Sequence, residues 1–327
     1  MNYSIHAFEL SLILNTEKFY RLKSWAYEKA KRKSKMFHKG EVDFDMALKD
    51  KGIKIEYHND KYKKKIKFVV NPTRLLGGDD VLKLWKPNRD NTSKMLTKLE
   101  KQISEYFDDE YGLNDFNLTR VDFTVNIKLD SQKAVSAYIK VLNSIGKVKG
   151  FSPKYSKSDR HIDKNNSFDM KGNSTEIEFS AYDKEAESKR KAASGILRLE
   201  VRLKKAKSIK KYTDKASTKK QIRDLASHSE SIFKGIVSKI IPYGDYHKKS
   251  EAEQIVKENI DKKTDREKML KLVELIPKKK SLYLAQKEMK YRNMENLMKK
   301  FAEINLSPIT ISKRQKVQSL KNLYAHL

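Results

Sequence analysis

The 327-residue chain contains no cysteine, so it has neither a disulfide framework nor a thiolate metal site. No apolar run approaches the roughly 20 residues that cross a bilayer, which disfavours a membrane partner. Gly77 and Gly78 are not followed by the Gly-Lys-Ser/Thr of a phosphate-binding loop, which disfavours a function driven by NTP hydrolysis. The seven histidines show no zinc-type spacing, and no Gly-x-Ser-x-Gly nucleophile elbow occurs. A cytoplasmic protein is the simplest expectation.

What the chain has in excess is positive charge. Lys and Arg total 72 against 43 Asp and Glu, which gives a formal net charge of +29. Such an excess indicates a polyanionic partner, and nucleic acid fits better than a membrane. Together with 16 Tyr and 13 Phe, the basic runs resemble surfaces that hold single strands. Each run taken alone is also typical of an ordinary solvated face. We expect DNA contacts at Arg120, Arg202, Lys63, Lys64, Lys65, Lys204, Lys205, Lys290 and Arg292.

Three segments alternate apolar and polar residues with a period of two, as half-buried strands do. They are residues 118–129, 174–184 and 196–205. Their polar faces carry Asp122 in the first segment, Glu176, Glu178 and Tyr182 in the second, and Arg198, Glu200 and Arg202 in the third. If the strands share a sheet, these acids and the tyrosine lie on one surface.

Such a surface has the parts of a metal-assisted phosphoryl-transfer site. The carboxylates of Asp122, Glu178 and Glu200 suit Mg²⁺ or Mn²⁺. Tyr182 attacks a phosphate only if a base, a metal-bound oxygen or a nearby cation helps to remove its proton. The candidates for this nearby cation are Lys184, Arg198 and Arg202. The alternative is that the polar faces are ordinary solvated cross-strand pairs.

The order of elements predicts a mixed α+β chain with mainly antiparallel strands. We expect a strand within residues 1–14, a helix over 16–36, a hairpin over 52–70 and helices over 92–106 and 131–145. Residues 152–173 are expected to form a loop. Strand patterns end near residue 218, and helices are expected over 218–241, 249–261, 264–276, 281–304 and 311–325, with breaks at Pro242, Pro277 and Pro308. This predicts a catalytic domain of residues 1–212 and a helical DNA-binding or assembly domain of residues 213–327.

Taken together, these segments resemble the gene II/X family of phage and plasmid replication proteins, and more distantly the Rep_trans type of plasmid initiators. The resemblance lies in the order of LTRVDFTVNIKL, EIEFSAYDKEAE and ILRLEVRLKK, preceded by VVNPTRLLGGDDV, and it covers roughly residues 50–212. It implies a rolling-circle initiator that nicks origin DNA with a divalent metal, forms a 5′-phosphotyrosine and later rejoins the strand. The implied partners are double- and single-stranded origin DNA, with host helicase and polymerase.

On this resemblance the family's tyrosine falls on Tyr182, its strand acid on Asp122, and its Arg-x-Glu on Arg198 and Glu200. Tyr212 is a rival nucleophile, because some related initiators place theirs after the third strand. The histidine pair of better-known rolling-circle nucleases is missing, so the ligand set is expected to be acid-rich, with Glu176 or Glu178 as substitutes. Two alternatives stay open: a non-catalytic basic DNA-binding protein, and a conjugative relaxase with the same chemistry.

Overall fold

The computed structural model describes residues 3–31, 36–39, 41–61, 63–80, 82–154 and 165–327. The chain divides into two compact units, which we call the first unit (residues 2–124 and 202–233) and the second unit (residues 125–201 and 234–327). Strands β6 (Asn117–Lys128) and β10 (Ile196–Leu203) contribute residues to both units. The expected domain boundary at residue 212 stays a prediction.

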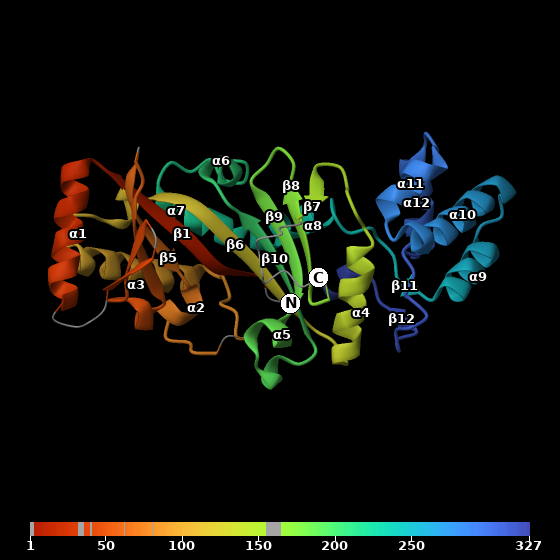
Figure 1. Cartoon of the computed structure of the whole chain (residues 1–327), viewed down its shortest axis with the longest axis horizontal. Helices are drawn as coiled ribbons and strands as arrows, with labels where there is room; N and C mark the ends of the chain where they lie inside the picture. Colours follow the sequence, from red (N-terminus) through yellow and green to blue (C-terminus); the bar gives the residue numbers. More distant parts are fainter. Residues whose placement is uncertain (1–2, 32–35, 40, 62, 81, 155–164) are drawn as a thin grey trace. The chain divides into compact units, whose positions relative to one another are not determined.

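The first unit is a sheet with helices, in which neighbouring strands follow the order β2-β3-β4-β5-β1-β6. Its strands before β6 are β1 (Ser4–Leu14), β2 (Met36–Lys39), β3 (Val42–Asp45), β4 (Ile53–Asn59) and β5 (Lys64–Val70). Its helices are α1 (Thr16–Lys31), α2 (Pro72–Leu75), α3 (Arg89–Tyr106), α6 (Ala206–Ile209) and α7 (Thr218–Ser227). Figure 1 shows these elements along the chain.

The register of the first unit's strands separates an apolar face from a charged face. Phe68 of β5 lies opposite Leu10 of β1 and Ile55 of β4, and all three side chains are fully buried. Rings of α3 and its C-terminal end cover this face, since Tyr106 and Phe107 lie 5.6 and 5.7 Å from the ring centre of Phe68. Successive strand residues point to opposite faces, so the residues between these apolar positions form the other, charged face.

The second unit joins strands to a mostly helical C-terminal region. Its strands follow the order β6-β10-β9-β8-β7, with β7 (Phe151–Pro153), β8 (Ser167–Gly172) and β9 (Ile177–Asp183). Its helices are α4 (Gln132–Asn143), α5 (Lys184–Ser188), α9 (Lys249–Asn259), α10 (Lys263–Lys279), α11 (Leu282–Met289) and α12 (Met294–Glu303). Helix α8 (Ser229–Val237) contributes residues to both units, and β11 (Tyr246–His247) pairs with β12 (Ser319–Leu320). In Figure 1, helices α9 to α12 lie close together and are drawn in shades of blue.

The predicted α+β class and the three alternating strands are confirmed, as β6, β9 and β10. The hairpin over 52–70 is also confirmed, as β4 and β5. No helix in the described part of the chain is both long enough and apolar enough to cross a membrane.

Several local predictions were wrong, among them the single helix expected over 218–241, which is two helices, α7 and α8. The loop expected over 152–173 contains β7 and β8, although residues 155–164 lie outside the described ranges. The helix expected over 281–304 is two helices, α11 and α12, because Lys290 adopts a left-handed conformation with φ of 49° between them. Residues 311–325 form turns, β12 and a short 3₁₀ turn. Helix α10 continues through Pro277 and ends only two residues later, where the proline interrupts just the last turn.

Candidate active site

Tyr182 and Glu200 meet in the second unit, on the neighbouring strands β9 and β10. The hydroxyl of Tyr182 donates a hydrogen bond to Oε1 of Glu200 at 2.6 Å. Glu200 is 3% exposed, whereas Tyr182 is partly exposed. The strand alternation that places both side chains on the polar face is the pattern seen in the sequence. A phenol that donates its proton to a carboxylate has the arrangement of a nucleophile and its general base.

Burial raises the pKa of Tyr182 well above its ordinary value of 10.0, and the charge of Glu200 raises it further. The nearby charge of Arg198 lowers the pKa of Tyr182, but the first two effects outweigh it. The tyrosine is therefore neutral at physiological pH. Its oxygen becomes a strong nucleophile only as the proton moves to an acceptor, and Glu200 is the acceptor already in place.

The polar face of β10 is buried, which differs from the solvated face of an ordinary half-exposed strand. Arg198 is fully buried and its Nε donates to Oδ1 of Asn126 in β6 at 2.7 Å. The apolar neighbours Leu197, Leu199 and Val201 are fully buried on the opposite face. A buried guanidinium needs polar partners, so this face makes buried polar contacts and not solvent-exposed cross-strand pairs.

Two residues that the sequence analysis did not single out hold the ends of these strands. Asp183, directly after Tyr182, caps α5 by accepting from the backbone N–H groups of Glu185 and Ala186 at 2.9 and 3.2 Å. Its other oxygen accepts from Gln132 at the start of α4, and Gln132 in turn accepts from the backbone of Gly195 at 2.9 Å. The Asp-x-x pattern before a helical turn was a usable signal for the cap, whereas Gln132 carries none.

Lys184 is buried at the beginning of α5 and forms an ion pair with Glu187. Its ammonium lies 6.0 Å from the ring centre of Tyr182. Lys184 thus contributes positive charge on the ring side of the phenol, while its hydrogen bond goes to Glu187.

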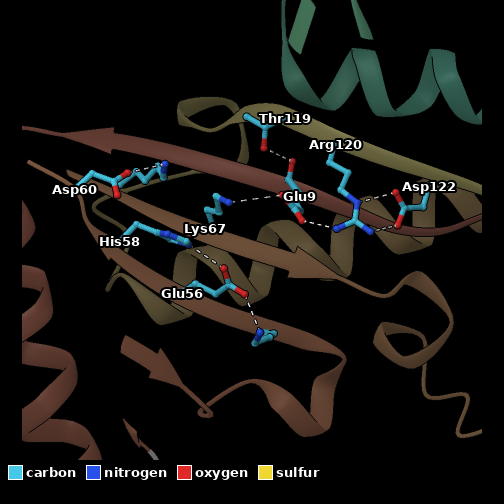
Figure 2. A network of polar contacts seen from close by, with 10 residues as sticks. Glu9, Glu56, His58, Asp60, Lys67, Thr119, Arg120 and Asp122 are labelled. Atoms are coloured by element: carbon cyan, nitrogen blue, oxygen red, sulfur yellow. Dashed lines mark hydrogen bonds and ion pairs between the residues drawn. The ribbon is translucent and has the colours of Figure 1, made fainter. Parts of the chain in front are cut away.

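Asp122 lies in the first unit and is 3% exposed. Arg120 on the same strand holds it with two bonds, Nε to Oδ1 at 2.7 Å and a terminal nitrogen to Oδ2 at 2.5 Å. Arg120 also donates to Glu9 of β1 at 2.8 Å, as Figure 2 shows. Burial lowers the pKa of Arg120, but the bonds and charge of Asp122 outweigh it and raise that pKa above its ordinary range. Arg202 lies 3.9 Å from the same carboxylate.

The charged face continues across β5 and β4 of the first unit (Figure 2). Lys67 lies 3.9 Å from Glu9, and Lys65 contacts Asp60 at 3.0 Å. On β4, Glu56 accepts from His58 and from Lys54, each at 2.8 Å. The hydrogen bond from His58 lowers the pKa of Glu56 to about 2, against the opposing effect of burial.

That lowered pKa predicts an acid-sensitive contribution to stability. The contribution of Glu56 is complete above its ordinary pKa of 4.5 and is lost as the pH falls through about 2. We expect wild-type protein to exceed the Glu56→Gln variant by on the order of 2–3 kcal/mol in unfolding free energy at pH 6, and by much less at pH 2. Urea unfolding followed by circular dichroism at pH 6, 4, 3 and 2 measures this. Parallel stability curves for the two proteins would contradict it.

The other expected contact residues are spread over both units. Lys63 is exposed before β5, and Lys64 donates to the backbone oxygen of Asp60 at 3.0 Å. Exposed residues of the predicted DNA-binding set follow β10 and α11, namely Lys204, Lys205, Lys290 and Arg292. Tyr212 is half-buried in the first unit, where burial raises its pKa. Among the described residues, no carboxylate accepts a hydrogen bond from the Tyr212 hydroxyl.

The predicted metal ligands do not form a cluster in the described part of the chain. There, no three His, Asp or Glu side chains are placed to hold a metal ion. Glu176 is exposed just before β9, and Glu178 contacts Lys154 at 3.5 Å. Glu178 and Tyr182 are four positions apart on β9, which separates their Cα atoms by about 13 Å. The described arrangement does not fit a three-ligand ion site, and these ligand assignments stay predictions.

Residues 26–218, more than half of the chain, match the family model Phage_CRI, which describes the N-terminal part of a replication-associated phage protein. The chain belongs to this Phage_CRI family. The match confirms the resemblance to the gene II/X proteins seen in the sequence motifs. The matched span contains Tyr182, Glu200 and Asp122, so the polar contacts of these residues lie within the part of the chain that defines the Phage_CRI family.

Among solved structures, the chain is similar to one described as a rolling circle replication initiator protein from Geobacillus stearothermophilus. The TM-score is 0.34 and the sequence identity 9%, over 73% of this chain and 85% of that one. No curated protein matches the chain. The family assignment therefore rests on the Phage_CRI match.

Proposed function

We propose that this Phage_CRI-family protein initiates rolling-circle replication by nicking origin DNA, with Tyr182 as the nucleophile. The observation that carries the proposal is the 2.6 Å hydrogen bond from the Tyr182 hydroxyl to the buried Glu200 carboxylate. Tyr212 lacks such a carboxylate among the described residues, which favours Tyr182 over it. The cytoplasm of the host is the proposed place of action.

In the proposed reaction, the Tyr182 oxygen attacks a backbone phosphorus as its proton passes to Glu200. The bond from phosphorus to the 3′ oxygen breaks, and that oxygen leaves as a 3′-hydroxyl after taking up a proton. The product is a 5′-phosphotyrosine, which conserves the phosphodiester energy for a later rejoining step. No NTP is required, in agreement with the missing phosphate-binding loop. The positive charges of Arg198 and Lys184 near the phenol support a developing negative charge.

The charge distribution supports DNA as the partner. The net charge is +29, and the first unit presents cations along the charged face of its sheet. Lys65, Lys67 and Arg120 lie on strands β5 and β6, to either side of β1. Phosphate contacts of this kind supply affinity that falls steeply with salt. Both double- and single-stranded origin DNA, together with a host helicase and polymerase, are the proposed partners.

The proposal is tested with a supercoiled plasmid carrying the cognate origin, incubated with the protein and either Mg²⁺, Mn²⁺ or EDTA. We expect site-specific conversion to open circles, and protein that stays attached to the 5′ end of the nicked strand in denaturing gels. The EDTA arm tests the metal requirement that the family resemblance implies. DNA that is bound but never nicked under any of these conditions would support the non-catalytic alternative.

A conjugative relaxase would share the nick and the covalent product. Its discriminating property is the DNA that it recognises, so the same assay is run on a plasmid carrying a transfer origin instead. We expect nicking at the replication origin only. Nicking confined to the transfer origin would assign the protein to that second class.

A further inference from the structure

A cavity of about 470 Å³ opens in the first unit, between the beginning of α3 and one face of α7. The residues that determine its chemistry are Arg89, Thr92, Lys215, Lys220, Arg223 and Asp224. Lys220, Arg223 and Asp224 share a helix face, because positions three and four apart are neighbours on a helix. The volume falls in the range of small-molecule sites, which is roughly 300–1,000 Å³.

The charge around this cavity is strongly positive. Arg89, Lys220 and Arg223 have no acidic partner within ion-pair distance among the residues that the structure describes. Lys215 is paired with the exposed Asp214 at 3.1 Å. The one acid of the lining, Asp224, contacts His228 at 3.3 Å. Three cations without an ion-pair partner and one carboxylate, Asp224, therefore line the same space.

Thr92 adds a donor beneath the cations. Its side chain lines the cavity and is 2% exposed, and its hydroxyl makes no hydrogen bond to any described residue. Because this hydroxyl has no hydrogen-bond partner among the described residues, it is available to donate to a molecule in the cavity. Helix α3 also begins here, capped by the side chain of Asn88, and its first-turn N–H groups favour an anion.

We propose that this cavity binds a nucleotide through its phosphate group. Lys220, Arg223 and Arg89 neutralise the phosphate, and the Thr92 hydroxyl donates to it. The remaining volume takes the attached base, for which a planar guanidinium provides a stacking surface. The nucleotide is either free or part of a DNA strand. This goes beyond the nicking reaction and does not depend on it, because neither Tyr182 nor Glu200 lines the cavity.

The test compares the wild-type 327-residue chain with the Lys220→Glu/Arg223→Glu variant. A matched control, Lys94→Glu/Lys98→Glu, makes the same charge change at exposed positions of α3 outside the cavity. A milder variant, Lys220→Gln/Arg223→Gln, avoids new negative charge, and circular dichroism verifies folding of all four proteins. Fluorescence anisotropy is measured with a fluorescent adenosine monophosphate and, separately, with a fluorescein-labelled single strand of thymidines without origin sequence.

We expect both cavity variants to lose at least about 10-fold in affinity for one probe relative to the control. Loss confined to the mononucleotide assigns a free nucleotide. Loss for the strand, with a salt slope lowered by roughly 1.4 for two phosphate contacts, assigns a DNA-borne nucleotide. Equal affinities of the folded cavity and control variants for both probes would overturn the proposal, whatever the nicking assay shows.

Discussion

The Tyr182→Phe variant is expected to form no covalent attachment to DNA and to lose at least about 10⁴-fold in nicking rate. The substitution removes only the hydroxyl, which is the attacking atom and the donor to Glu200. Loss of a nucleophile that acts together with its base costs this much or more in other covalent enzymes. The rate of plasmid nicking and the yield of denaturant-stable protein–DNA adduct measure the effect.

The matched control for this experiment is Tyr212→Phe, which removes the same atom from the rival tyrosine. It should retain both nicking and adduct formation, with DNA affinity unchanged in either variant. An adduct that survives in Tyr182→Phe and disappears in Tyr212→Phe would transfer the nucleophile to Tyr212. The Tyr182–Glu200 bond would then be a structural contact.

The Arg120→Met variant is expected to lose about 3 kcal/mol of unfolding free energy. It leaves the carboxylate of Asp122, which is 3% exposed, without the two hydrogen bonds from Arg120, and it also removes one of the two cations that contact Glu9. Breaking one side of a buried ion pair costs more than the pair contributes, because the remaining charge has lost its water. Urea unfolding at pH 7, followed by circular dichroism, gives the value.

Lys54→Met is the control on the same charged face. Lys54 is 46% exposed in its ion pair with Glu56, so its removal should cost no more than about 1 kcal/mol. Equal losses for the two variants would show that Asp122 does not depend on Arg120. That outcome would favour Asp122 as a metal ligand over Asp122 as a structural partner of Arg120.

The strands that carry the site could be predicted because their two faces differ in chemistry. In β9 and β10, alternation places Tyr182 and Glu200 on the polar face, and the structure brings them into contact. Strand β8 was missed although Phe168 and Met170 alternate with Ser167 and Asp169, because the polar residues before it resemble a loop. The segment 311–325 has helical periodicity, yet tertiary contacts such as the one from Lys248 to Ser312 at 2.7 Å hold it in turns.

The contacts that hold the site residues in place could not be predicted from local sequence patterns. Gln132 forms hydrogen bonds with Asp183, which is 51 positions away in the sequence, and with Gly195, which is 63 positions away. A local periodicity of the sequence does not predict contacts at such separations. The burial of Arg198 was also unexpected, since a mid-strand arginine is usually solvated. Its partner Asn126 lies 72 positions away on β6. Contacts of this kind depend on which strands become neighbours, and this order emerges only in the assembled sheet.

Burial of β10 on both faces also bears on how the site moves. Residues 197–201 have almost no exposed surface, so their amide protons should exchange with deuterium only through openings close in free energy to global unfolding. Glu200 is therefore held on a segment that does not fluctuate on its own. Tyr182 is partly exposed, and rotation of its side chain is the cheaper motion. The proton acceptor stays in place, and the distance between the phenol and the phosphate depends on the rotation of the Tyr182 side chain and on where the DNA binds.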